Sequence, residues 1–368
     1  METSIRIRVR RGALIAMAAL AGACMAQQPQ VTHAAFRVES GSLQLAIASV
    51  QTPGWVGYQL ATSHRLRTGT VDNVLHLEGV RDDEGQTHTI DANAPTPPTI
   101  VLLRVVSGQV MKIRVDEMDR EIDGGGLPFV WVSNVSGADS VKTMKAIVDT
   151  NAAKEVPSAS GDKADRELDR DARRVQDGAL VSIALGDTPE GTAALRSFTA
   201  TSYPTDLRER AAFWLANERG AEGFITVKSL LQAEQNQSLR EKLVFDLTLV
   251  KGDSHKAAVD ELLSLAKSDA SPAIRGKAQF WLAQVVAKQP DSRVTELLDQ
   301  QASNDPNAAI RRSAVFALSR LPANEGVPRL VQLASTTKDP ATRREAIFWL
   351  GQSRDPQALA YLEKLVTQ

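Results

Sequence analysis

One hydrophobic pattern of ten residues recurs through the second half of the chain. Its five copies begin at residues 207, 239, 274, 310 and 342, so successive copies start 32, 35, 36 and 32 residues apart. Each copy has arginine second, phenylalanine seventh and leucine ninth. In the first copy, Leu207, Ala211, Trp214 and Leu215 fall on one face of a helical wheel. A helix repeated at this spacing is typical of a solenoid of stacked helical units.

A second amphipathic run follows each copy after a short turn, for example KAAVDELLSLAK and SRVTELLDQQA. The turns before the copies include Asp305-Pro306 and Asp339-Pro340, which place a capping oxygen ahead of a proline suited to the first helical turn. One helical hairpin cannot bury its own apolar faces, so neighbouring hairpins must stack. A degenerate copy, in which Gln176 replaces the arginine, extends the array to about six hairpins.

The order of a hydrophobic residue, arginine, alanine and leucine after an Asp-Pro turn resembles the first helix of HEAT repeats. The resemblance covers roughly residues 165 to 368. It implies a right-handed α-solenoid whose extended surface, its concave face above all, binds other proteins. GWVGY and VWV in the first half are similar to an N-terminal domain that precedes such repeats in some exported bacterial proteins.

Two sets of residues are predicted to pack the repeats together. Phe213 points about 240° from Leu207 on the helical wheel, so the helix is apolar on two sides and needs neighbours on both. The expected packing residues are Phe213, Phe245, Phe280, Phe316 and Phe348, with Leu215, Leu247, Leu282, Leu318 and Leu350.

The arginines of the copies form a ladder, which consists of Arg208, Arg240, Arg275, Arg311 and Arg343. One interpretation is a cationic stripe that binds an acidic peptide, a glycan or a phosphate. The other is ion pairing and carbonyl capping between repeats, with Asp269, Asp305 and Asp339 as partners. The second is favoured because acidic residues accompany the arginines, although exposed pairs contribute only about 0–1 kcal/mol each.

The first half of the chain alternates apolar and polar residues between Gly, Pro, Asn and Asp, which is typical of short strands. Ser107-Gly108 predicts a hairpin turn between two of them. Residues 139–148 predict a helix that closes this domain. We therefore expect an α+β multidomain protein, divided into a β-rich domain at 33–150, a polar linker at 151–165 and a HEAT-like solenoid at 166–368.

Residues 1–26 have the form of an export signal, with four arginines before a short apolar run and small residues. Cys24, the single cysteine, could be the acylated residue of a lipoprotein. Simple cleavage near Ala23 or Ala26 is favoured, and cleavage beyond Cys24 would remove the cysteine. The mature protein is expected to be periplasmic or lipid-anchored to the envelope, without a transmembrane span. A cytoplasmic protein with an apolar first helix is the alternative.

Composition and motifs narrow the possible chemistry. A formal net charge of −1 gives no general field that attracts nucleic acid. His64, His76 and His88 stand twelve residues apart but lack the short-range pairing of metal ligands, so surface positions are favoured. Asp123-Gly124-Gly125-Gly126 lacks the features of a phosphate-binding loop and predicts a strand connection. No catalytic, cofactor-binding or metal-binding residue is assigned.

Function follows from the repeats. The expected role is a non-catalytic scaffold of the bacterial envelope that binds a protein partner through the solenoid surface. The alternative is an enzyme, or an enzyme accessory, with its site in the β-rich domain and the repeats as a docking arm. A third possibility is self-association through the last repeat, whose helix with Tyr361, Leu362, Leu365 and Val366 lacks a polar cap.

Overall fold

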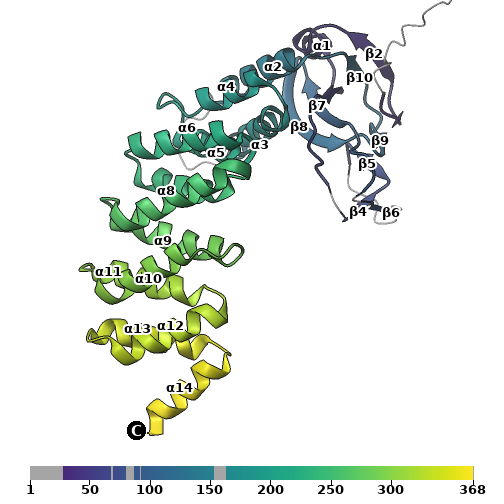
Figure 1. Cartoon of the computed structure of the whole chain (residues 1–368). Coiled ribbons are helices and arrows are strands. Elements are labelled where there is room, and N and C mark those ends of the chain that lie inside the picture. Colours follow the sequence, from purple (N-terminus) through teal and green to yellow (C-terminus); the bar gives the residue numbers. More distant parts are fainter. Residues whose placement is uncertain (1–27, 68, 80–86, 92, 153–162, 368) are drawn as a thin grey trace, which may run out of the picture.

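The computed structural model describes residues 28–67, 69–79, 87–91, 93–152 and 163–367. A β-rich domain lies at one end of a column of helices, and the column ends at the C-terminal helix (Figure 1). The expected export signal at residues 1–26, Cys24 included, lies outside the described residues, as does most of the expected linker. The architecture is α+β with a helical repeat, as the sequence predicted.

Five strands form the main sheet. Their spatial order is β2 (Phe36–Ser40), β10 (Phe129–Ser133), β3 (Gly54–Leu60), β7 (Thr99–Val106) and β8 (Gln109–Glu117). Strand β10, the second in this order, runs parallel to both of its neighbours, whereas β3, β7 and β8 pair antiparallel. The predicted hairpin turn joins β7 to β8, and both Ser107 and Gly108 have positive φ, at 49° and 72°. Two such residues are what a tight two-residue hairpin turn requires.

Two small sheets complete the domain. The first contains three parallel strands, β1 (Val31–Thr32), β9 (Glu121–Asp123) and β5 (Val74–His76). The second pairs β4 (Gly69–Asp72) with β6 (Thr87–Ile90). One face of the main sheet and the three-stranded sheet enclose a core that contains Trp55, Phe129 and Trp131. These aromatic residues are therefore structural.

Helices cover the other face of the main sheet. They are α1 (Leu43–Ser49), α2 (Gly137–Ala152) and α3 (Lys163–Leu185). The Tyr58 hydroxyl lies 2.7 Å from Ser140 Oγ, and the Leu43 amide donates to Asp139 at 2.8 Å, so α2 is tied to both β3 and α1. The sequence predicted α2 but not α1, because seven residues are too few for a helical period to be recognised.

Six helical hairpins follow one another in the described residues (Figure 1). Their helices are α3 with α4 (Pro189–Ser197), α5 (Thr205–Glu218) with α6 (Gly220–Ala233), α7 (Gln237–Asp246) with α8 (His255–Ser268), α9 (Pro272–Val286) with α10 (Ser292–Asn304), α11 (Ala308–Ser319) with α12 (Ala323–Thr336), and α13 (Pro340–Gln352) with α14 (Pro356–Thr367). Two short 3₁₀ turns, η1 (Leu247–Leu249) and η2 (Gly252–Ser254), separate α7 from α8. The ten-residue copies lie on α5, α7 and η1, α9, α11 and α13, whose helices pack side by side in series.

The β-rich domain shares one hydrophobic core with the first hairpin and with α5 of the second. Val101 and Leu103 of the sheet belong to the same cluster as Leu180 of α3 and Leu215 of α5, and all four are fully buried. Helix α3 approaches β8 so closely at Gly178 that an added Cβ would lie 2.5 Å from Ile113 Cβ. The sheet thus packs directly against the start of the solenoid.

Candidate protein-binding surface

A row of aromatic rings crosses the helices that carry the copies. Neighbouring ring centroids in the row are 4.8 to 5.8 Å apart. In spatial order the aromatic row consists of Phe245, Trp281, Phe280, Phe316, Trp349 and Phe348. Phe280 and Phe316, from successive repeats, stack with an angle of 6° between their planes. Four helices, α7, α9, α11 and α13, therefore contribute to one continuous aromatic surface.

The structure separates the two sets of residues that the sequence assigned to packing. The leucines Leu215, Leu247, Leu282, Leu318 and Leu350 are fully buried. The phenylalanines are only partly buried, and Phe348 is 54 % exposed. Seventh and ninth positions differ by about 200° around a helix, so the two sets face opposite ways. The phenylalanines contact one another or neighbouring tryptophans at the surface and are not among the side chains of the described core clusters.

Tryptophan at the eighth position completes the row. Trp281 contacts Phe245 of the preceding repeat and Phe280 of its own, and Trp349 bridges Phe316 and Phe348 in the same way. Both tryptophans are partly buried against the solenoid core. This role was missed in the sequence, although tryptophan occupies the eighth position in three of the five copies.

The eighth position of the ten-residue copy on α7 is Asp246, which is 2 % exposed. Its Oδ2 atom has no hydrogen-bond partner among the described residues. Burial raises the pKa of this carboxyl well above its usual value; the charge of Glu209 adds to the rise, and that of Lys242 opposes it. Burial therefore favours the neutral form of this carboxyl more than it is favoured in an exposed aspartate.

Asp246 lies at a cavity of about 180 Å³ between α5 and α7. This cavity, the Asp246 pocket, is lined by Glu209, Arg210, Phe213, Trp214, Lys242, Phe245 and Asp246. The rings of Phe213 and Trp214 meet edge to face, with centroids 5.2 Å apart. Phe245 belongs to both the pocket and the aromatic row, so the two features adjoin.

The cationic side chains of the pocket have anionic partners. Lys242 Nζ is 3.2 Å from Glu209 Oε1. Arg210 contacts Asp177 at 2.8 Å and Asp206 at 2.9 Å. Among the described residues, Asp246 is the acidic group of the pocket that forms no ion pair with these cations.

The arginine ladder reaches carbonyl and carboxylate oxygens at the ends of helices. Its contacts are Arg208 with the Glu234 carboxylate, Arg240 with the Asp269 carboxylate (2.7 Å), Arg275 with the Asp269 carbonyl (2.8 Å), Arg311 with the Asp305 carbonyl (2.8 Å) and the Asp339 carboxylate (3.1 Å), and Arg343 with the Thr337 carbonyl (2.5 Å). Such contacts cap helix ends and join adjacent helices. They also occupy the guanidinium groups that a bound anion would need.

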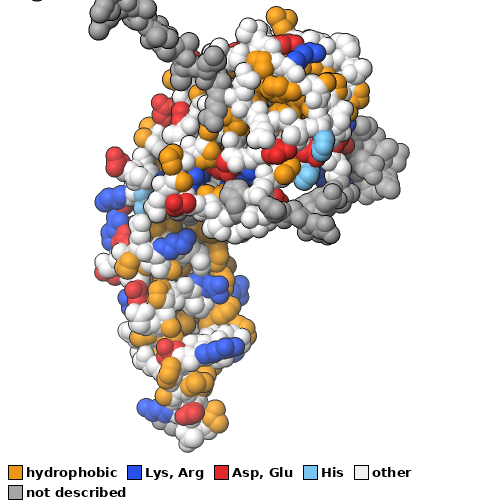
Figure 2. All heavy atoms as spheres, turned by 90° about the vertical axis from the view of Figure 1, so that its right-hand side faces the viewer, with side chains coloured by type: hydrophobic (Ala, Val, Ile, Leu, Met, Phe, Trp, Pro, Cys, Tyr) orange, Lys and Arg blue, Asp and Glu red, His pale blue; other side chains and the backbone are white. Residues whose placement is uncertain are grey.

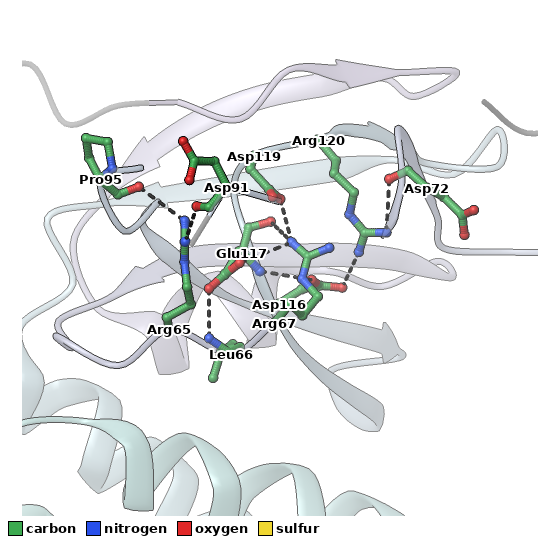
Figure 3. A network of polar contacts seen from close by, with 10 residues as sticks. All are labelled: Arg65, Leu66, Arg67, Asp72, Asp91, Pro95, Asp116, Glu117, Asp119 and Arg120. Carbon is green, nitrogen blue, oxygen red and sulfur yellow. Dashed lines mark hydrogen bonds and ion pairs between the residues drawn. The ribbon is translucent and has the colours of Figure 1, made fainter. Parts of the chain in front are cut away.

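A network of charged side chains lies at one edge of the β-rich domain (Figure 3). Arg67 pairs with Asp116, Glu117 and Asp119, and Arg120 contacts Asp116 at 2.7 Å. Glu117 also accepts a 2.7 Å hydrogen bond from the Leu66 amide. The network holds the segment after β3 against the end of β8. Its members are about 50 residues apart in sequence, so no local pattern signals it.

Of the three histidines that the sequence singled out, His64 and His76 lie in different parts of the described structure. His64 lies 3.4 Å from Glu218 of α5, whereas His76 lies 3.1 Å from Asp123 in the three-stranded sheet. The side chain of His88 is outside the described part of the structure. Asp123 also meets His33 at 3.2 Å, and the Gly125 amide is the main cause of the lowered pKa of its carboxyl. Among the described residues, no group of three or more His, Cys, Asp or Glu could hold a metal ion.

The surface of the helical column mixes hydrophobic side chains with lysines and arginines on the face shown in Figure 2. Apolar side chains are also exposed on α14, where Leu365 and Val366 are 45 % and 86 % exposed. No helix within the described ranges is both long enough and apolar enough to cross a membrane.

The match to a family model agrees with the helical architecture. Residues 294–368 match the family model for HEAT repeats. No curated protein matches the chain. Similar solved structures include YibA of Escherichia coli, with 20 % identity, a TM-score of 0.34, and coverage of 50 % of this chain and 66 % of that one. Human deoxyhypusine hydroxylase in complex with glycerol is 15 % identical, with a TM-score of 0.29 and coverage of 61 % of this chain and 90 % of that one. The family match and the stacked hairpins identify the helical part of the protein as a HEAT-like repeat domain.

Proposed function

We propose that this protein is a non-catalytic scaffold that binds a protein partner through the aromatic row of its solenoid. The observation that carries the proposal is the continuous contact of six aromatic rings over four successive repeats. Aromatic residues are enriched in protein interfaces, where a few of them provide most of the binding free energy. HEAT-like repeats commonly mediate protein interactions through such extended surfaces.

The geometry of the row favours binding. Each ring is held by one or two neighbouring rings, so its conformation is restricted before a partner arrives. Restricted side chains lose less conformational entropy on association. Phe348, with 54 % of its side chain exposed, offers apolar area that a partner could cover.

Charge argues for a protein partner over a polyanion. The chain is nearly neutral, and the arginines of the ladder already contact protein oxygens. Nucleic acids and phosphate-rich ligands need cations that are available to neutralise them. A partner that covers apolar rings does not have this requirement.

We place this scaffold in the bacterial envelope as part of the same proposal. Support comes from residues 1–26, where four arginines precede an apolar run and small residues. Cell fractionation of the full chain, with a Cys24→Ala variant to test acylation, would check it. A chain that stays in the cytoplasm at full length would contradict the location without affecting the binding surface.

Affinity capture from an envelope extract, followed by purification of the captured protein, tests the binding role. The test variant is Phe316→Ala/Phe348→Ala, which removes two rings of the row. The matched control is Ile225→Ala, since Ile225 is 61 % exposed on α6, outside the row. We expect the double variant to weaken binding of the purified partner about tenfold or more, and the control to bind normally. Equal binding of the partner by the wild type, the double variant and Ile225→Ala would contradict the proposal.

A further inference from the structure

We propose that the Asp246 pocket receives the cationic end of a lysine or arginine side chain of the protein partner. This inference rests on the proposed function and makes it more specific, because it assigns a chemical preference to one place on the binding surface. The pocket lies beside Phe245, where the aromatic row ends.

One lining residue of the pocket, Asp246, supplies an acidic group. Asp246 is buried, with only 2 % of its surface exposed. Its Oδ2 atom has no hydrogen-bond partner among the described residues. An isolated buried carboxyl is unfavourable in a folded protein. A cation that reaches it from a partner would satisfy the carboxyl and stabilise its charged form.

The walls of the pocket are suited to the same group. Phe213, Trp214 and Phe245 line it. Aromatic faces attract lysine and arginine cations, and tryptophan does so most strongly. A carboxylate between aromatic rings binds a cation by both charge and ring contact, whereas an apolar side chain would leave the carboxyl without a partner.

Size and the surrounding charges narrow the ligand further. A volume of about 180 Å³ is small for a metabolite, since ligand pockets usually measure about 300–1,000 Å³. It is adequate for the end of one side chain. The cations at the pocket do not occupy Asp246, since Lys242 pairs with Glu209, and Arg210 pairs with Asp177 and Asp206.

The position in the repeat supports the assignment independently. The equivalent positions on α5, α9 and α13 are Trp214, Trp281 and Trp349, two of which extend the row. Asp246 replaces a ring at this point. The surface therefore changes from an apolar row to an acidic pocket within one repeat.

The test uses the full chain and four short peptides, acetyl-Gly-X-Gly-amide, in which X is arginine, lysine, citrulline or norleucine. Citrulline and norleucine keep the shape of arginine and lysine without the charge. Ligand-observed NMR would measure each dissociation constant. We expect the arginine or lysine peptide to bind, and its neutral analogue to bind about tenfold more weakly or not at all.

Three variants locate the site. Asp246→Asn keeps the size of the side chain and removes its charge, and Phe245→Leu removes one ring. Both should weaken the cationic peptide about tenfold. Asp299→Asn is the matched control. Burial also raises the pKa of Asp299, but this residue lies on α10, away from the pocket, and pairs with Arg329 of α12. This variant should bind normally. Thermal melts of all variants establish that they are folded.

Three outcomes would overturn the inference: no saturable binding of either cationic peptide, equal binding of charged and neutral peptides, or unchanged binding by Asp246→Asn. The capture experiment distinguishes a failure of this inference from a failure of the proposed function. If Phe316→Ala/Phe348→Ala loses the partner but Asp246→Asn retains it fully, the scaffold role stands and the cation pocket is wrong.

Discussion

Arg208 of α5 and Glu234, which follows α6, form an ion pair that is almost completely buried, with exposed fractions of 6 % and 9 %. Burial by itself would raise the pKa of Glu234, but the Asn236 amide and Arg208 outweigh it, so the pKa of Glu234 is lowered. The pair joins the helices of one hairpin at the start of the solenoid. Its burial distinguishes it from the rest of the arginine ladder.

Removing Arg208 should therefore cost more than removing any other arginine of the ladder. Arg208→Ala leaves the Glu234 charge buried without its cation, and the free energy of unfolding should fall by about 3–5 kcal/mol. Arg275→Ala, which removes a contact with the Asp269 carbonyl, should cost about 1 kcal/mol or less. Urea unfolding would compare the two. Similar losses in both variants would mean that the buried pair has no special weight.

Phe280 and Leu282 lie two residues apart on α9, but their replacement by alanine should lower the stability of the protein by different amounts. Leu282 is fully buried in the solenoid core, and its replacement by alanine should lower stability by about 2–5 kcal/mol. Phe280→Ala removes ring contacts at the surface and should cost only about 1 kcal/mol. Chemical denaturation measures both. A larger loss for Phe280 would show that the row is a structural element.

Asp246→Asn should stabilise the protein in a pH-dependent way. Because burial raises the pKa of Asp246, the unfolded chain releases this proton at a lower pH than the folded protein does. The wild type therefore loses stability as pH rises from about 4 towards the folded-state pKa, whereas the variant has no such proton.

Near pH 8 the free energy of unfolding of Asp246→Asn should exceed that of the wild type by roughly 1–3 kcal/mol, because the substitution replaces a buried, unpaired carboxyl with a side chain that carries no charge. Its advantage should shrink as pH falls towards 4. Unfolding free energies measured across this range would show the trend. Parallel curves for variant and wild type would contradict the assigned burial of the carboxyl.

Two helical glycines test the close packing of the sheet against the solenoid. An added Cβ at Gly178 would lie 2.5 Å from Ile113 Cβ, whereas one at Gly351 would meet no atom within 4 Å beyond its chain neighbours and the nearby backbone of its own helix. Gly351→Ala should stabilise α13 by about 0.5–1 kcal/mol. Gly178→Ala should destabilise the protein by about 1–3 kcal/mol, because α3 and β8 must move apart. Thermal unfolding of both variants checks the sign, and stabilisation by Gly178→Ala would contradict the contact.

Several features of the fold could be predicted from the sequence because they depend on local periodicity. The ten-residue copies identified the helices that stack, and the Ser107-Gly108 dipeptide identified a hairpin turn. Helical and strand patterns repeat within a few residues, so one chain carries enough information to recognise them.

The tertiary structure decided how these elements meet. It placed the sheet, the first hairpin and α5 around one core, and it left the phenylalanines outside the core clusters. It also brought Phe213, Trp214, Phe245 and Asp246 to one cavity. The shared core joins residues as far apart as Leu103 and Leu215, and no local pattern in the sequence encodes such a contact. Burial depends on which helix packs against which, so a carboxyl that looks like any surface aspartate becomes a candidate binding group only when its neighbours are assembled.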